Sequence, residues 1–226
     1  MTTSGTSVFN LDIQEIVEEA FERAGLEMRT GYDLRSARRS LNILAAEWAN
    51  RGYNLWTVTD YAILMSTGVA TYDLPADTID TLDHVVRSTQ NSVDTDIVVR
   101  RLSLSSYAAI PNKMTPGRPV QVFVDRQIQP TITVWPVPTN SNDQLVVWYL
   151  RRMQDTGAGG AFNMDIPFRF IPPLIAGLAY MVALKRPKEV PEPRVERLLA
   201  EYTAQWDLAA SEDRDRTSLR LVPGMR

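Results

Sequence analysis

The side chains with the greatest chemical reactivity are scarce in this chain. Its 226 residues contain no cysteine and one histidine, His84. Without cysteine, disulfides, thiolate nucleophiles and Cys/His zinc sites are excluded. A Ser-His-Asp triad would have to use His84, but no serine lies in a G-x-S-x-G turn or a comparable nucleophile context. The sequence therefore predicts a protein that is not an enzyme, and it leaves open only a paired-carboxylate cleft of the kind found in hydrolases.

Three further features have both a functional and a structural interpretation. The Gly-rich segment 156–161 could bind phosphate, but its glycines match neither the dinucleotide fingerprint nor the Walker loop, so we expect a flexible hinge. Asp77, Asp80 and Asp83 could bind calcium, but they lack the spacing and the glycine of an EF-hand loop, so we expect loop acids. His84 could sense pH or could be a packed or surface residue. We predict no cofactor and no metal ion.

The charge composition bears on partners. The chain has 24 basic and 27 acidic residues and a formal net charge of -3, so no overall positive field attracts nucleic acid or anionic lipid. Arginine outnumbers lysine 21 to 3, which favours protein interfaces because the guanidinium group makes bidentate contacts. Codon bias in a GC-rich genome explains the excess equally well.

Four amphipathic or apolar segments predict helices. The first begins at an N-cap, Asp12, and ends at Gly25, and the second begins at an N-cap, Asp33, and ends at Gly52. The third covers 168–184, with two prolines in its first turn, and the fourth begins near Pro191 or Pro193. The apolar window 170–184 is too short for a membrane span, so we expect a buried helix. The initial segment 1–7 has the character of a polar tail, not of a signal peptide.

The middle of the chain has the two-residue period of β-strands, and turn residues recur at short intervals. We expect six to seven strands with some helical turns over 103–110. The first hairpin should pair 59–65 with 69–74, and the second should pair 85–88 with 97–102 around a polar loop at 89–96. Further strands are predicted at 120–125, 131–135 and 144–152.

These elements predict an α+β fold class: a four-helix bundle with an inserted antiparallel β domain between helices 2 and 3, and an extended C-terminal tail. The bundle should comprise 1–55 and 166–212, because each helix pair has an apolar stripe that it cannot bury alone. Trp48 and Trp206 lie on these stripes, so we expect them in the core. The β domain with its hinge should cover 56–165, and the tail 213–226.

Several segments resemble the head-to-tail adaptors of short-tailed bacteriophages, also called tail accessory factors or tail tubular proteins of type A. The similar segments, in chain order, are 12–25, 31–42, 47–57, 71–75, 117–119, 166–180 and 185–187. The resemblance implies a dodecameric ring beneath the portal protein that joins it to the tail nozzle or tube and continues the DNA exit channel.

The same resemblance implies partners and a location. The partners would be the portal protein, the nozzle or tube protein and neighbouring adaptor subunits, with genomic DNA passing through the lumen without sequence-specific binding. The protein would lie in the neck of the virion and in the host cytoplasm during assembly. The alternative is a DNA-binding or packaging accessory protein of the virion. That alternative calls for a basic helix face or an aromatic-lined groove, neither of which is evident from the sequence.

The C-terminal tail is the predicted contact with the portal or a neighbouring subunit. Three apolar residues alternate imperfectly around an arginine, as in a short strand that could add to a sheet edge. Flanking arginines could bind carboxylates of a partner. A frayed chain end is the alternative. The predicted contact residues are Arg214, Arg216, Leu219, Arg220, Leu221, Val222 and Arg226.

Overall fold

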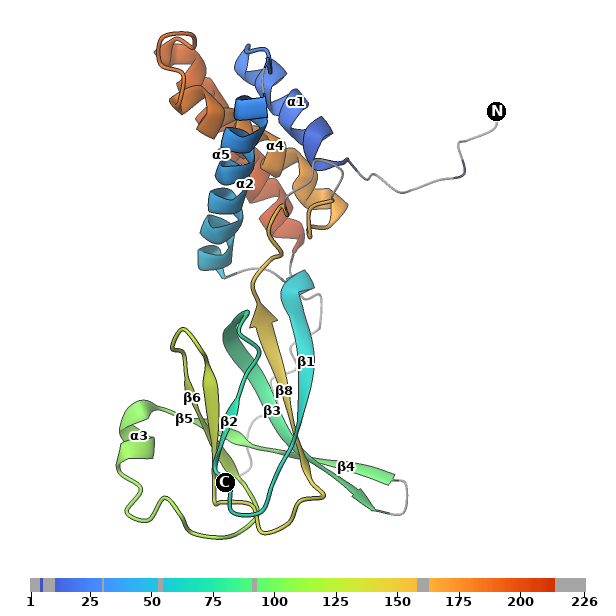
Figure 1. Cartoon of the computed structure of the whole chain (residues 1–226), viewed down its shortest axis with the longest axis vertical. Coiled ribbons are helices and arrows are strands. Elements are labelled where there is room, and N and C mark those ends of the chain that lie inside the picture. Colours follow the sequence, from blue (N-terminus) through green and yellow to red (C-terminus); the bar gives the residue numbers. More distant parts are fainter. Residues whose placement is uncertain are drawn as a thin grey trace, which may run out of the picture. The chain divides into compact units, whose positions relative to one another are not determined.

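The computed structural model describes residues 5, 11–29, 31–52, 55–90, 93–157 and 163–213. The chain divides into two compact units (Figure 1). The helical unit contains the described residues up to Trp56 and from Met153 onward. The β unit is Thr57–Arg152.

The helical unit contains four α-helices: α1 (Ile13–Ala24), α2 (Gly31–Arg51), α4 (Ile171–Leu184) and α5 (Glu192–Glu212). A capping box begins α1, because Asp12 accepts from the Glu15 N–H at 2.8 Å and Glu15 accepts from the Asp12 N–H at 3.0 Å. The helix ends at Gly25, whose φ of 75° is left-handed. The predicted first helix is therefore confirmed.

The predicted N-cap of the second helix is wrong. α2 begins at Gly31, so Asp33 lies within its first turn. The Asp33 carboxylate is buried, accepts the Arg29 N–H at 3.1 Å and forms an ion pair with Arg186. The ion pair of Asp33 with Arg186 thus connects the start of α2 to the chain that follows α4. The residues next to Asp33 in the sequence do not indicate this partner.

The core of the helical unit surrounds α4, which contacts α1, α2 and α5. A one-turn 3-10 helix, η2 (Phe168–Phe170), precedes α4, and the prolines fall in the first turn as predicted. Trp48 and Trp206 are buried, as expected, with ring centroids 4.9 Å apart. Trp48 Nε1 donates to Tyr202 Oη at 2.9 Å. A Cβ on Gly177 would lie 2.9 Å from Tyr202, so glycine lets α4 and α5 approach closely.

The β unit contains two four-stranded sheets, preceded by a one-turn 3-10 helix, η1 (Leu55–Thr57). The first sheet has the order β1 (Val58–Leu64), β8 (Gln144–Arg151), β3 (Thr78–Gln90) and β4 (Val93–Val98), and all its pairs are antiparallel. The second has the order β2 (Thr71–Asp73), β7 (Thr131–Trp135), β6 (Gln121–Asp125) and β5 (Arg100–Leu102). Buried side chains from both sheets form one core, which includes Met65, Val86, Val122, Ile132 and Leu145.

The expected fold class, a four-helix bundle with an inserted antiparallel β domain, is wrong. The described residues form five α-helices and two sheets of four strands, and three of the five helices follow β5 in the chain. The additional helix, α3 (Leu104–Ala108), is capped by Ser103 and lies between β5 and β6. It connects two parallel strands, so the sheets are not wholly antiparallel. The chain is α+β, and the expected extended tail falls outside the described residues, apart from Asp213.

The first predicted hairpin is also wrong. β1 pairs with β8, whereas β2 pairs with β7 in the other sheet. Met65 and Leu74 are both buried in the shared core, and the chain between β1 and β2 passes from one sheet to the other. The second hairpin forms only in part: residues 97–98 of β4 pair with β3, but residues 100–102 form β5 of the other sheet. Most of the predicted polar loop is strand. Arg87 of β3 and Asp96 of β4 form an ion pair at 2.8 Å, which explains how this polar segment can form paired strands.

Candidate partner-binding surface

The outer side of α2 carries the candidate site. Arg35, Arg38 and Arg39 share one side of the helix because they are separated by three and four residues. Lys185, at the C-terminal end of α4, lies beside them: its amine donates to the Ser36 carbonyl at 3.0 Å. We call these four residues the cationic face.

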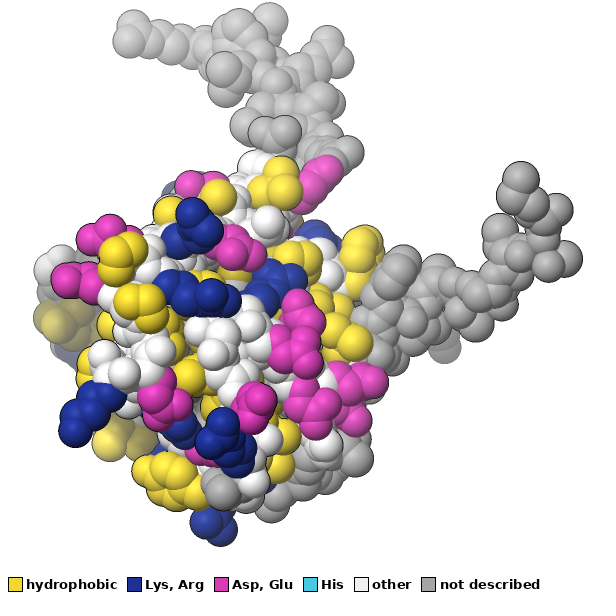
Figure 2. Space-filling model, turned by 90° about the horizontal axis from the view of Figure 1, so that it is seen from above, with side chains coloured by type: hydrophobic (Ala, Val, Ile, Leu, Met, Phe, Trp, Pro, Cys, Tyr) yellow, Lys and Arg dark blue, Asp and Glu magenta, His cyan; other side chains and the backbone are white. Residues whose placement is uncertain are grey.

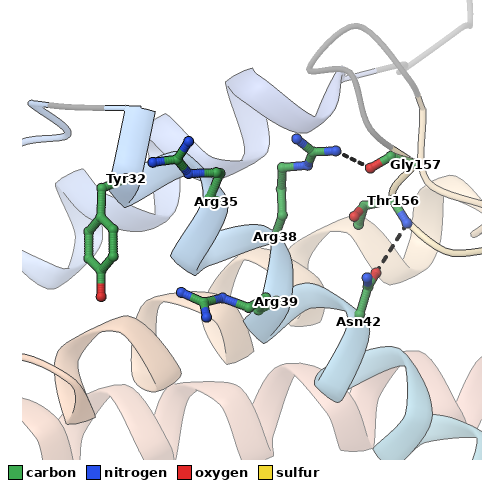
Figure 3. Close-up of a pocket in the computed structure, with 7 residues that line it drawn as sticks. All are labelled: Tyr32, Arg35, Arg38, Arg39, Asn42, Thr156 and Gly157. Carbon is green, nitrogen blue, oxygen red and sulfur yellow. Dashed lines mark hydrogen bonds between the residues drawn. The ribbon is translucent and has the colours of Figure 1, made fainter.

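The surface at the cationic face is hollowed. One hollow of about 530 Å³ is lined by Tyr32, Arg35, Arg38, Arg39, Asn42, Thr156 and Gly157 (Figure 3). In that view the guanidinium groups of Arg35 and Arg39 extend toward the side of Tyr32, whereas Arg38 points toward Gly157. A second hollow of about 400 Å³ shares Tyr32 and Arg39 and adds Ile43 and Lys185. The two hollows therefore share residues and lie along the same helix.

The segment that leaves the β unit forms one wall of the site. The Thr156 N–H donates to Asn42 Oδ1 at 3.1 Å, and Arg38 donates to the Gly157 carbonyl (Figure 3). Arg38 Nε is buried and has no hydrogen-bond partner. An unsatisfied buried donor is costly to the folded chain.

No carboxylate neutralises the cationic face among the described residues. Lys185 donates to neutral groups only: the Ser36 carbonyl, the Ser36 hydroxyl at 3.2 Å and the Ser40 hydroxyl at 2.6 Å. Burial lowers the pKa of Lys185, and the nearby Arg39 charge lowers it further. Elsewhere in the unit arginines bind carboxylates, as Arg23 does with Glu19 at 2.8 Å. The arrangement therefore suits an anionic group, either a phosphate or a carboxylate.

The residues predicted as contacts in the tail lie outside the described residues. These are Arg214, Arg216, Leu219, Arg220, Leu221, Val222 and Arg226. Docking of the tail therefore stays a prediction. Most of the Gly-rich segment also falls outside, since the structure describes only residues 156 and 157 of it.

His84 is a packed residue of β3. Its side chain is buried, with the residue 3% exposed, and Nε2 lies 2.9 Å from Thr81 Oγ1. Burial, with a smaller contribution from Arg101, lowers its pKa to about 4, against opposing effects of Asp83 and Asp80. The imidazole is therefore neutral at physiological pH.

Of the acids considered for calcium, Asp77 lies in a turn as expected of a loop acid, whereas Asp80 and Asp83 lie within β3, so the expectation is wrong for these two. Asp80 forms ion pairs with Arg101 at 2.8 Å and Arg126 at 3.2 Å. Within the described ranges, no three acidic or histidine side chains are grouped so that they could hold a metal ion. Likewise, no helix in the part of the chain that the structure describes is long and apolar enough to cross a membrane.

The cationic face was not evident from the sequence. The Arg38–Arg39 doublet was visible, and the spacing to Arg35 could have indicated a basic helix side, but Lys185 joins it only through the packing of α4. A basic helix face was expected only of the DNA-binding alternative and was not evident from the sequence. The structure corrects that interpretation, because such a face exists.

Residues 12–224 match the family model described as SU10 adaptor protein. The chain therefore belongs to the SU10 adaptor protein family and is a phage head-to-tail adaptor, as the resemblance implied. A comparison with curated proteins finds no match.

Proposed function

We propose that the protein is a non-enzymatic structural connector that forms a ring beneath the phage portal. In this role it joins the portal protein to the tail nozzle or tube and continues the DNA exit channel in the neck of the virion. Neighbouring copies would complete a dodecameric ring during assembly in the host cytoplasm. The observation that carries the proposal is the family match, which extends over both units of the chain.

The segments that resemble adaptors support this proposal through their structural positions. Residues 12–25 are the capped helix α1, and 166–180 contain η2 and most of α4. They build the framework of the helical unit, and this framework holds the cationic face of α2 at the surface. A connector needs such a rigid framework with exposed surfaces for several partners.

The cationic face gives some support to the second candidate, a DNA-binding or packaging accessory protein. Four neighbouring cations could neutralise phosphates and release counterions. A duplex-binding protein should then show a steep salt dependence that is lost when Arg35 and Arg39 are replaced by Glu. We expect only weak binding at physiological salt, because the net charge of the chain is -3.

Electron microscopy of the protein mixed with its cognate portal tests the connector proposal. We expect additional ring-shaped density on one end of the portal and none on portals incubated without the protein. Portals that show no added density at saturating protein would overturn the proposal. Submicromolar binding to duplex DNA with a steep salt slope would instead favour the second candidate.

A further inference from the structure

A second charged surface, opposite in sign, lies on α1. The exposed acids Glu15, Glu18 and Glu22 share one side of this helix, and we call them the acidic face. Figure 2 looks onto the helical unit and shows acidic side chains gathered at one side of it.

No ion pair neutralises the acidic face within the part of the chain that the structure describes. Glu15 accepts a backbone N–H in the capping box, and Glu18 accepts from Gln14 Nε2 at 2.8 Å. The cation on α1, Arg23, is already paired with Glu19 and Glu201. Among the described residues no ion pair joins the acidic face to the cationic face.

The two faces are opposite in charge, and the acidic face is longer than the row of arginines but shorter than the surface on α2 that includes Tyr32 and Ile43. At about 1.5 Å per residue, the acidic face extends about 10 Å along α1 and the arginines extend about 6 Å along α2. Tyr32 and Ile43 flank the arginines and are 61% and 60% exposed, which lengthens the surface on α2 to about 16 Å. Tyrosine and arginine are both enriched at protein interfaces.

We propose that the cationic face of one copy binds the acidic face of the next copy in the ring, an inference that rests on the proposed function. The two surfaces differ, so the contact is heterologous and each copy offers one of each. A heterologous contact repeats from copy to copy and closes into a ring when the rotation allows it. Guanidinium groups form bidentate bonds with carboxylates, and Arg35 and Arg39 are exposed at the cationic face.

The surroundings of the cationic face favour carboxylates of a protein over phosphates of DNA. The exposed ring of Tyr32 and the exposed aliphatic side chain of Ile43 have no counterpart on a phosphate backbone, whereas a helix surface can cover them. The cations also do not continue along α2. Beyond Ile43 the next charged side chain is Glu47, which forms an ion pair with Arg51. A nucleic-acid strand that followed α2 would therefore meet no further unpaired cation on this helix. The short acidic face can bind the cationic face without further cations.

Engineered cysteines test the contact directly, because the chain has none of its own. Glu18→Cys and Arg39→Cys chains are mixed in equal amounts, with and without portal, and treated with a short bismaleimide. We expect a cross-linked dimer from the mixture and little from either chain alone, since a heterologous contact brings unlike residues together. The matched control mixes Glu18→Cys with Arg197→Cys, an exposed arginine of α5 outside the cationic face.

The outcomes separate this inference from the proposed function. If rings are seen on portals but cross-linking does not exceed the control, the proposed contact is overturned and the connector role is retained. Cross-linking above the control in solution without rings on portals supports the contact and overturns the connector role. If neither rings nor cross-linking above the control are seen, both the contact and the connector role are overturned.

Charge reversal adds a second readout. The variants Arg35→Glu/Arg39→Glu and Glu18→Arg/Glu22→Arg should each weaken ring formation about tenfold, and the chain with all four substitutions should recover most of it. Glu196→Arg, on α5, serves as the control for an added positive charge. If the arginine variant loses duplex DNA binding while the glutamate variant forms rings normally, the cationic face binds phosphate and the proposal fails.

Discussion

Lowering the pH from 7 to 5 should destabilise the β unit through His84. The folded protein holds this imidazole neutral, with its pKa lowered from 6.5 to about 4, chiefly because the side chain is buried. The unfolded chain takes up a proton as the pH falls through 6.5, and the folded protein does not. The stabilisation is therefore fully present above the unfolded pKa and is lost as the pH falls toward 4.

The size of the effect follows from the two pKa values. Between pH 7 and pH 5 the free energy of unfolding should fall by about 2 kcal/mol on account of this group. His84→Gln provides the matched variant, because its amide does not titrate and can still bond to Thr81 Oγ1, the present partner at 2.9 Å. Urea denaturation at the two pH values should show that the wild type loses about 2 kcal/mol more than the variant.

A direct titration strengthens the test. The chain has one histidine, so its imidazole proton resonance is assigned without ambiguity. We expect it to titrate near 4 in the folded protein. A resonance that titrates near 6.5, or equal losses of stability in the wild type and His84→Gln, would refute the reasoning from burial.

Three substitutions test the packing of the helical unit. Gly177→Ala should lower Tm and cost about 1–3 kcal/mol although alanine favours helices, because its Cβ would lie 2.9 Å from Tyr202; an unchanged Tm would contradict this close approach. Asp213→Asn should cost about 2–3 kcal/mol in urea denaturation, since the buried carboxylate pairs with Arg169; a loss below about 0.5 kcal/mol would show that the pair is dispensable. Tyr202→Phe should cost about 1–2 kcal/mol and alter tryptophan fluorescence, because Trp48 Nε1 loses its acceptor; unchanged stability and emission would refute that role.

The elements that were predicted well from sequence are those specified by local interactions. Asp12 and Glu15 satisfy each other's backbone N–H groups within four residues, and Gly25 ends the helix by its own backbone conformation. The prolines at the starts of α4 and α5 act in the same local way. Such features can be recognised in a short window of sequence.

Strand pairing could not be predicted in the same way, because partners lie far apart in the chain. Residues 59–65 and 69–74 look like a hairpin, yet Val58 pairs with Leu150 and Thr71 pairs with Thr133. The burial of Met65 and Leu74 against both sheets decides this arrangement. By contrast, the helical turns expected over 103–110 are confirmed by α3, because the Ser103 cap is a local signal.

The candidate site was only partly visible for the same reason. The doublet Arg38–Arg39 is evident, but whether arginines are neutralised depends on tertiary neighbours. Arg186 meets Asp33 across the unit, whereas Lys185, the adjacent residue, meets only serine groups of α2. Sequence distance does not distinguish these two cations, so the cationic face became apparent only in the fold.

The pairing of β1 with β8 has a mechanical consequence. Val58 lies opposite Leu150, so the chain enters and leaves the β unit on neighbouring strands at one end of a sheet. Two peptide segments, not one, therefore tether this unit to the helical unit. A force that pulls the units apart would be divided between two backbones. Two connections also restrict rotation of one unit against the other more than a single connection would. A protease that severed either segment alone would leave the two units covalently joined.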